Sequence, residues 1–135
     1  MERKEISAFD IGNHVEVQLL IDVDEAETSE NITIHLSLLD QEIFSSHYQY
    51  LNAYQEFRDR LLDLGYGLKC NGSRINAVQS PMMSCTDKVY LVELGQKALM
   101  KDIVHIFDYA YIDEFCTTQQ QNEFFDEWMK SLNGG

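Results

Sequence analysis

The chain has 135 residues, of which 44% are hydrophobic and 11% aromatic, and its formal net charge is -13 at pH 7. This length fits one domain covering residues 1–135, and the apolar content excludes an intrinsically disordered chain. The strong acidity excludes nucleic acid as a partner, because the phosphates would be repelled.

The first predicted elements are two strands joined as a hairpin. In Val15–Val23 the odd-numbered residues are apolar, and Ile32–Leu38 repeats the alternation. A period of two is typical of half-buried strands, so the segment between them, Asp24 to Glu30, is the predicted loop of an antiparallel hairpin. The other face of both strands is expected to carry the polar side chains Glu16, Gln18, Asp22, Thr33, His35 and Ser37.

A helix is predicted over Ser46–Leu64. Ser46 followed by Gln49 has the spacing of a capping box, and Gly65 is a suitable left-handed stop. One face of this helix repeats at helical spacing and is expected to be buried: Tyr50, Tyr54, Phe57, Leu61 and Leu64.

Shorter strands and a second helix follow. Asn71-Gly72 suits a tight hairpin turn, and the segments 88–94 and 102–108 read as further strands. The last helix is predicted over Thr118–Leu132, starting at Thr117 or Thr118 with a glutamine three residues on. Its buried side is expected to hold Phe124, Trp128 and Leu132.

Together these elements predict a single-domain α+β fold. Its mainly antiparallel sheet contains the N-terminal hairpin plus three or four later strands, and two helices pack on one face. The opposite face is left open to water or to a partner. No stretch reaches the roughly 18 apolar residues of a membrane span, and the charged start predicts no secretion signal. Cys70, Cys85 and Cys116 lack metal or disulfide spacing, which indicates reduced thiols in the cytoplasm.

The acidic loop raises the question of a metal site. A calcium loop starting at Asp22 needs an oxygen ligand at its fifth position, a glycine at its sixth and a glutamate at its twelfth. This chain has Ala26, Glu27 and Thr33 at those positions. The four histidines are scattered and none has zinc-ligand spacing with a cysteine. The sequence therefore predicts no metal and no cofactor.

The signs of an enzyme are weak. Cys70 and His105 would have to meet across the sheet to form a nucleophile and its base, and His105 lies between apolar neighbours as a buried core histidine would. No nucleophile-elbow, zinc-protease, dinucleotide or phosphate-loop pattern is present. We expect no catalytic activity and assign no catalytic residues.

Electrostatic recognition of a protein remains. From Glu5 to Phe57 the chain has eleven acidic residues and no lysine or arginine. Such clusters attract basic proteins and speed their docking, although an ordinary solvated loop is the simpler explanation of each. The candidate partner-binding residues form two patches, with tyrosines as anchors in the second: Asp22, Asp24, Glu25, Glu27 and Glu30, and then Asp108, Tyr109, Tyr111, Asp113 and Glu114.

The C-terminal half adds a resemblance. The stretches "CNGSRINAVQSPMM", "HIFDYA" and "QNEFFDEWMKSL" resemble small acidic bacterial proteins encoded beside polymorphic toxins, including those of contact-dependent growth inhibition. The resemblance implies an immunity protein of the toxin–antitoxin kind, which binds one cognate toxin domain and blocks it stoichiometrically. A basic nuclease domain is the expected partner, because an acidic cover competes with nucleic acid for the same charges.

The alternatives are a small non-catalytic ligand-binding or structural module of the bacterial cytoplasm and, less favoured, an enzyme that depends on Cys70 or His105. The toxin's activity, the face that forms the interface and the oligomeric state stay open at this level.

Overall fold

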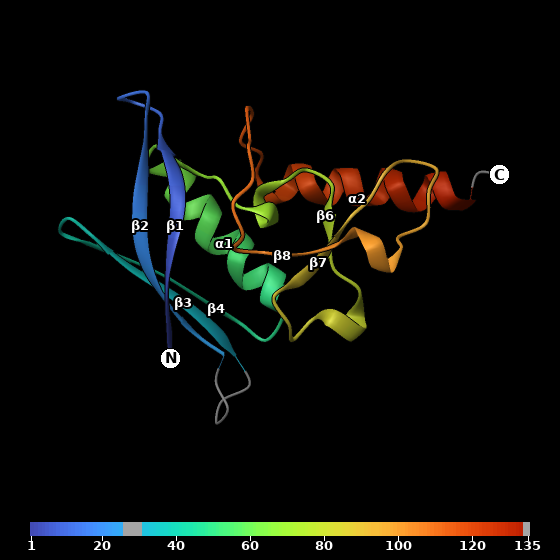
Figure 1. Cartoon of the computed structure of the whole chain (residues 1–135), viewed down its shortest axis with the longest axis horizontal. Coiled ribbons are helices and arrows are strands. Elements are labelled where there is room, and N and C mark those ends of the chain that lie inside the picture. Colours follow the sequence, from blue (N-terminus) through green and yellow to red (C-terminus); the bar gives the residue numbers. More distant parts are fainter. Residues whose placement is uncertain (26–30, 134–135) are drawn as a thin grey trace.

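The computed structural model describes residues 1–25 and 31–133. Five strands form its larger sheet, which is antiparallel throughout and has the order β4-β3-β2-β1-β5. The strands are β1 (Glu2–Asp10), β2 (Val15–Asp24), β3 (Ile32–Leu38), β4 (Gln41–His47) and β5 (Tyr66–Leu68). One helix, α1 (Tyr50–Asp63), lies against the inner face of this sheet and contacts β3, β4 and β5 (Figure 1).

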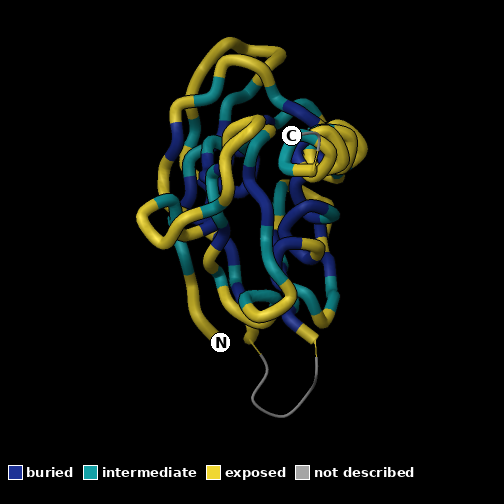
Figure 2. The backbone as a smooth tube through the Cα atoms, turned by 90° about the vertical axis from the view of Figure 1, so that its right-hand side faces the viewer, coloured by how far each residue is buried: buried dark blue, intermediate teal, exposed yellow. Residues whose placement is uncertain are grey.

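The second half of the chain builds a smaller antiparallel sheet in the order β6-β7-β8. It consists of β6 (Ala77–Val78), β7 (Lys88–Leu91) and β8 (Ile103–His105), with short 3-10 helices at Asn71–Ser73, Pro81–Met83 and Met100–Asp102. The second helix, α2 (Thr118–Asn133), buries Trp128 in a small cluster with Val78 and Val92. Figure 2 shows that most of α2 is exposed.

The α+β class, with two helices and mainly antiparallel strands, is confirmed. The predicted hairpin is also confirmed, because β2 pairs antiparallel with β3 through Asp22↔His35 and Val23↔Ile34. The strands after α1 are divided between two sheets, and α2 packs on the smaller one. Two strands were not predicted: β1, which becomes central between β2 and β5, and β4.

The predicted start of α1 at Ser46 is wrong. Ser46 belongs to β4, which continues to His47, and the helix begins at Tyr50. No side chain of the predicted capping box caps it. Instead the N–H of Tyr50 donates to the carbonyl of Ser84 (2.7 Å), and that of Leu51 donates to Gln79 Oε1 (3.2 Å). Helix N–H groups need such partners, and here a distant loop supplies them.

The buried face of α1 is confirmed at Tyr50, Tyr54, Phe57 and Leu61, each fully buried. Leu64 departs from the prediction, with 42% of its surface exposed, because it lies one residue beyond the helix. The chain then turns at Gly65, whose φ of 95° is the left-handed conformation expected at a helix stop.

The predicted Asn71-Gly72 hairpin turn is wrong. These residues start a buried 3-10 helix, and Gly72 is required for close packing. A Cβ atom on Gly72 would lie 2.8 Å from both the Tyr54 ring and the Ile106 side chain. Tertiary packing against α1, and not local turn preference, therefore decides the conformation.

The last helix matches its prediction closely. Thr117 and Gln120 form the expected cap, since the N–H of Thr117 donates to Gln120 Oε1 (2.9 Å) and the N–H of Gln120 donates to Thr117 Oγ1 (3.3 Å). Trp128 is buried, with Phe124 and Leu132 half-buried beside it. In the part of the chain that the structure describes, neither helix is long and apolar enough to cross a membrane.

Candidate interaction surface

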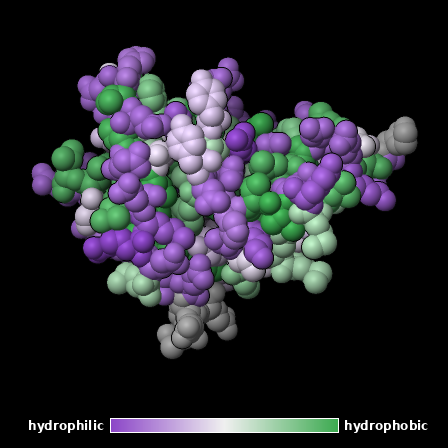
Figure 3. All heavy atoms as spheres, in the orientation of Figure 1, coloured by the Kyte–Doolittle hydropathy of each residue, from purple (hydrophilic) through white to green (hydrophobic). Residues whose placement is uncertain are grey.

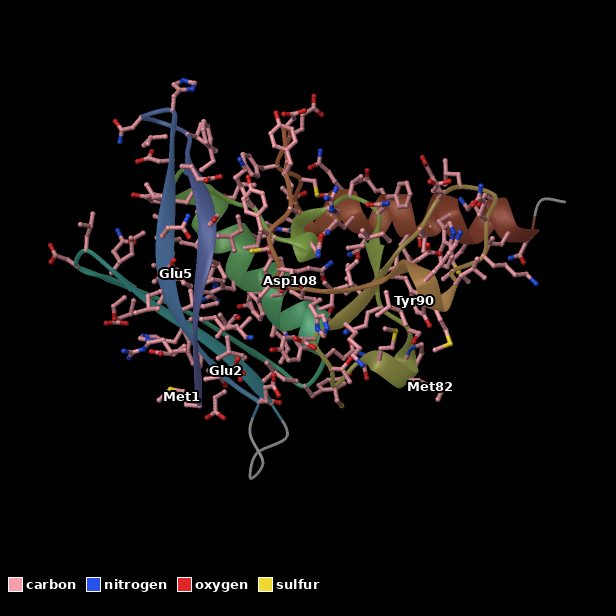
Figure 4. The ribbon with its side chains drawn as sticks, viewed as in Figure 1. Met1, Glu2, Glu5, Met82, Tyr90 and Asp108 are labelled. Atoms are coloured by element: carbon pink, nitrogen blue, oxygen red, sulfur yellow. The ribbon has the colours of Figure 1, made fainter. Side chains whose placement is uncertain are left out.

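The outer face of the larger sheet, opposite α1, is the predicted polar face. In β2 and β3 buried residues alternate with exposed or half-exposed ones, so the second set points away from the core. Glu16, Gln18, Asp22, Thr33, His35 and Ser37 all belong to this set. Figure 3 shows hydrophilic side chains gathered over β1 and β2, and Figure 4 places Glu5 on β1.

Asp22 does not present an isolated negative charge on this face. Arg3 Nε donates to Asp22 Oδ1 at 3.0 Å from β1, and His35 Nδ1 lies 3.9 Å from Asp22 Oδ2 on β3. His35 also contacts Glu42 on β4. Ser37 Oγ donates to Glu42 at 2.9 Å, and this bond, followed by the His35 contact, lowers the pKa of the Glu42 carboxyl. A row of ionisable side chains in contact, which we call the charge ladder, thus crosses four strands: Arg3, Asp22, His35 and Glu42.

The acidic hairpin loop is only partly described. Asp24 ends β2 and is exposed. Glu25 accepts a hydrogen bond from the Tyr50 hydroxyl at 3.0 Å, which ties the loop to the start of α1. Glu27 and Glu30 lie outside the described residues. Glu25, a member of the first predicted patch, therefore has a structural contact with α1.

The second patch lies on a segment that pairs with residues 69–71, directly after β5. The N–H of Ala110 donates to the carbonyl of Lys69 (3.0 Å), and the N–H of Asn71 donates to the carbonyl of Asp108 (3.0 Å). This pairing fixes residues 108–110 beside residues 69–71. Figure 4 shows Asp108 on this segment after β8, and its side chain is exposed.

Two tyrosines on this segment enclose a lysine. Lys69 Nζ lies 5.6 Å from the Tyr109 ring centroid and 5.2 Å from that of Tyr111. It is also 3.0 Å from Glu16 Oε1, and the Tyr109 hydroxyl donates to the same oxygen at 3.3 Å. The Glu16 contact raises the pKa of Lys69. We call Glu16, Lys69, Tyr109 and Tyr111 the tyrosine cluster.

The segment is anchored on the outer sheet face by Phe115. Its ring stacks on Phe9 of β1 with centroids 6.3 Å apart, and it lies over Gly67 of β5. A Cβ atom on Gly67 would fall 2.4 Å from the Phe115 ring, so only glycine leaves room there. Because Phe9, Glu16 and Lys69 share the outer face, the tyrosine cluster and the charge ladder belong to one surface.

The remaining acidic residues of the second patch surround Tyr111. Asp113 is exposed, and its hydrogen bond with Tyr111 raises the pKa of that hydroxyl. Glu114 is exposed and, with Tyr111, lines a cleft of about 360 Å³ whose other walls include Ile75 and Phe115. Tyr111 and Glu114 therefore lie at a cleft, with Asp113 beside Tyr111, and the partner-binding role of this patch stays a prediction.

Sequence reasoning missed Arg3 and Lys69 as members of this surface. Their roles depend on the pairing of β1 with β2 and on the segment that follows β8, and neither was predicted. Glu16 was expected on the open face but not as the partner of a lysine 53 positions later.

Cys70 and His105, the two residues that the enzyme alternative would need, lie in different surroundings. His105 was expected to be buried in a central strand, and this is wrong: it is exposed in β8, with Nδ1 3.2 Å from Asp87 Oδ1. Cys70 is buried beside Tyr54, and burial raises the pKa of its thiol to about 12. A thiol held neutral in the core is a poor nucleophile. In residues 1–25 and 31–133, no group of three His, Cys, Asp or Glu side chains is arranged to hold a metal ion.

We expect one of the three thiols to react readily in the folded protein. All three are free, but Cys85 is exposed whereas Cys70 and Cys116 are buried. Iodoacetamide at pH 8 should modify Cys85 at least about 100-fold faster than the other two, because only the accessible thiolate reacts. Peptide mass spectrometry gives the rates, and unfolding in urea should equalise them. Comparable native rates at Cys70 and Cys85 would contradict the buried position of Cys70.

No family model matches the chain, and a search of the curated proteins finds no match. The functional proposal therefore rests on the chemistry of the surface and on the resemblance described above.

Proposed function

We propose that this protein is a bacterial immunity protein that binds a cognate, basic toxin domain and occludes it stoichiometrically in the cytoplasm. The observation that carries the proposal is the joining of acidic side chains and exposed tyrosines on one surface. The outer sheet face leads directly into the tyrosine cluster, where Tyr109 is 56% and Tyr111 66% exposed. Protein interfaces combine aromatic anchors with a polar rim in this way.

The charges suit a basic partner. On the outer face Glu5 and Glu42 are exposed, and Asp113 and Glu114 add two carboxylates at the tyrosine end. The paired residues Arg3 and Asp22 contribute little net field, so the exposed carboxylates dominate the attraction. A nuclease domain carries the positive charge that such a surface attracts.

The ligand-module alternative has one observation in its favour. A cleft of about 280 Å³ between α1, β6 and α2 is lined by amide and apolar side chains, including Gln55, Val78, Asn122 and Phe125. A small ligand found in this cleft of the purified protein, together with no binding of the toxin, would move this alternative to first place.

Charge reversal tests the proposed interface. We expect Glu5→Lys with Asp113→Lys to slow association with the product of the adjacent toxin-like reading frame about 10-fold at low salt. The difference should shrink as salt rises, and dissociation should change less, because exposed charges act chiefly on encounter. Surface plasmon resonance at two salt concentrations measures both rates.

The matched control is Asp126→Lys with Glu127→Lys, which changes the net charge equally on exposed positions of α2. Its effect should be clearly smaller. An equal effect would mean that total charge, and not this surface, steers the partner. Tyr111→Ala should weaken affinity at least about 30-fold if that ring is an anchor. Absence of any complex with the wild-type protein would overturn the proposed function.

A further inference from the structure

The tyrosine cluster has the chemistry of a cation-binding cage. Two aromatic faces and one carboxylate surround the Lys69 ammonium, with the distances given above. Aromatic faces attract cations through their negative quadrupole, and sites for lysine-like and quaternary ammonium ligands are built in this manner. We call Glu16, Tyr109 and Tyr111 the cage, and its cation in this structure is the protein's own Lys69.

The walls of the cage are held by backbone contacts that do not involve the lysine ammonium. Glu16 lies on β2, which pairs with β1 along its length. Tyr109 and Tyr111 flank Ala110, whose N–H is bonded to the Lys69 carbonyl, and the N–H of Lys69 donates to the Ser7 carbonyl at 2.8 Å. The backbone of Lys69 and of the segments that carry the cage residues is fixed by these bonds. The long Lys69 side chain can therefore leave the cage while Glu16, Tyr109 and Tyr111 keep their positions.

The exposure of the components makes exchange feasible. The Lys69 side chain is only 12% exposed, whereas both tyrosines are more than half exposed. A partner that approached along the outer sheet face would meet the exposed tyrosine side chains before it met Lys69. Lysine is flexible and strongly hydrated, so it returns to water readily, and arginine stacks on aromatic faces better than lysine does.

We propose that Tyr109, Tyr111 and Glu16 form a binding site for a cationic side chain, which Lys69 occupies until an arginine or lysine of the partner takes its place. The contacts described here support the binding site itself. That the incoming cation is a side chain of the partner protein rests on the proposed function. Exchange of one cation for another keeps the charge of Glu16 balanced, so docking here leaves no unpaired carboxylate. Lys69 acts as an internal competitor that rejects weakly basic partners.

A small cation tests the cage without the toxin. Tetramethylammonium is titrated into wild-type protein, Lys69→Ala and Lys69→Gln, and the chemical shifts of the residues around Tyr109 are followed by NMR. We expect both variants to bind at least about 10-fold more tightly than the wild type, because the internal competitor is gone. Lys69→Ala with Tyr111→Leu should lose this gain. The control Lys101→Ala, which removes an exposed lysine, should behave as the wild type.

Equal binding by Lys69→Ala, Lys69→Gln and Lys101→Ala would overturn the cage. A second measurement follows the exchange itself, by acetylation of lysines with an activated ester. Lys69 should react more slowly than Lys101 in the free protein and faster in the complex with the toxin domain. A further fall of Lys69 reactivity on complex formation would overturn the exchange. If no complex forms, the proposed function fails, while the tetramethylammonium titration still decides the cage.

Discussion

Replacing Arg58 with alanine is expected to lower the free energy of unfolding by about 3–5 kcal/mol. Arg58 lies on α1 with only 1% of its side chain exposed. Its Nε donates to Asp59 Oδ1 at 2.8 Å, and its Nη2 donates to Gln121 Oε1 at 2.7 Å and to Thr118 Oγ1 at 3.3 Å. Removal of the guanidinium leaves the buried Gln121 and the half-buried Asp59 and Thr118 each short of a donor. The loss at the buried Gln121 costs more than the bond itself contributes.

The network around Arg58 connects three parts of the molecule. Asp59 also accepts the N–H of Thr118 (3.2 Å), and Gln121 donates to the carbonyls of Gly72 (2.9 Å) and Arg74 (2.7 Å). It thereby holds the start of α2 against α1 and the buried 3-10 helix. Because α2 follows directly on the segment that carries Tyr109 and Tyr111, the same network fixes one end of the candidate interaction surface.

Two further variants sharpen this prediction. In Arg58 the Nη1 atom is buried without a hydrogen-bond partner among the described residues, so part of the cost of burying the charge is not recovered. Arg58→Met, which keeps the length and removes the charge, should therefore cost less than Arg58→Ala. Arg60→Ala is the control: that side chain is 53% exposed on the same helix, and its loss should cost within about 1 kcal/mol. Urea unfolding at pH 7 measures all three. Equal losses for Arg58→Ala and Arg60→Ala would contradict the network.

Raising the pH from 8 to 10.5 is expected to lower the free energy of unfolding by about 4 kcal/mol or more. Burial raises the pKa of Cys70 from 9.0 to about 12 and also raises the pKa values of Cys116, Tyr50 and Tyr54. The unfolded chain releases the two thiol protons above about pH 9 and the two tyrosine protons above about pH 10, while the folded protein retains them. Each such group then removes about 1.4 kcal/mol of stability per pH unit. For each group, the contribution to stability is complete at a pH below its pKa in the unfolded chain. That contribution declines as the pH rises toward its higher pKa in the folded protein.

Cysteine variants assign the slope. Cys70→Ala should reduce the slope of the unfolding free energy against pH by the contribution of about one released proton. Cys85→Ala should leave the slope unchanged, because that side chain is exposed to water in both states. The comparison uses slopes and not absolute stabilities, so a modest loss from the core substitution does not obscure it. A free energy that stays constant from pH 8 to 10.5, measured by urea unfolding, would show that these groups ionise equally in both states.

The sequence by itself determined the elements whose periodicity is strong. The alternation in Val15–Val23 and Ile32–Leu38 specified a hairpin and its open polar face, because a period of two places every second side chain on one side. The spacing of the apolar residues in α1 and α2 specified both helices and most of their buried sides. The sequence also showed the acidity of the chain and the presence of Tyr109 and Tyr111, but only as residue types and not as neighbours of Lys69.

Only the tertiary structure decided how these elements combine. The alternation in β1 is short, and pairing with β2 and β5 is what makes this segment a strand. Ser46 belongs to a strand because its neighbours Ile43 and Ser45 face the core. Gly72 lies in a buried 3-10 turn, where Tyr54 and Ile106 leave no room for a Cβ atom. The approach of Lys69 and Glu16 to the tyrosines depends on contacts across 40 to 93 positions. Local patterns carry no information about such distant partners, since packing against the rest of the fold selects among many conformations that the local sequence allows.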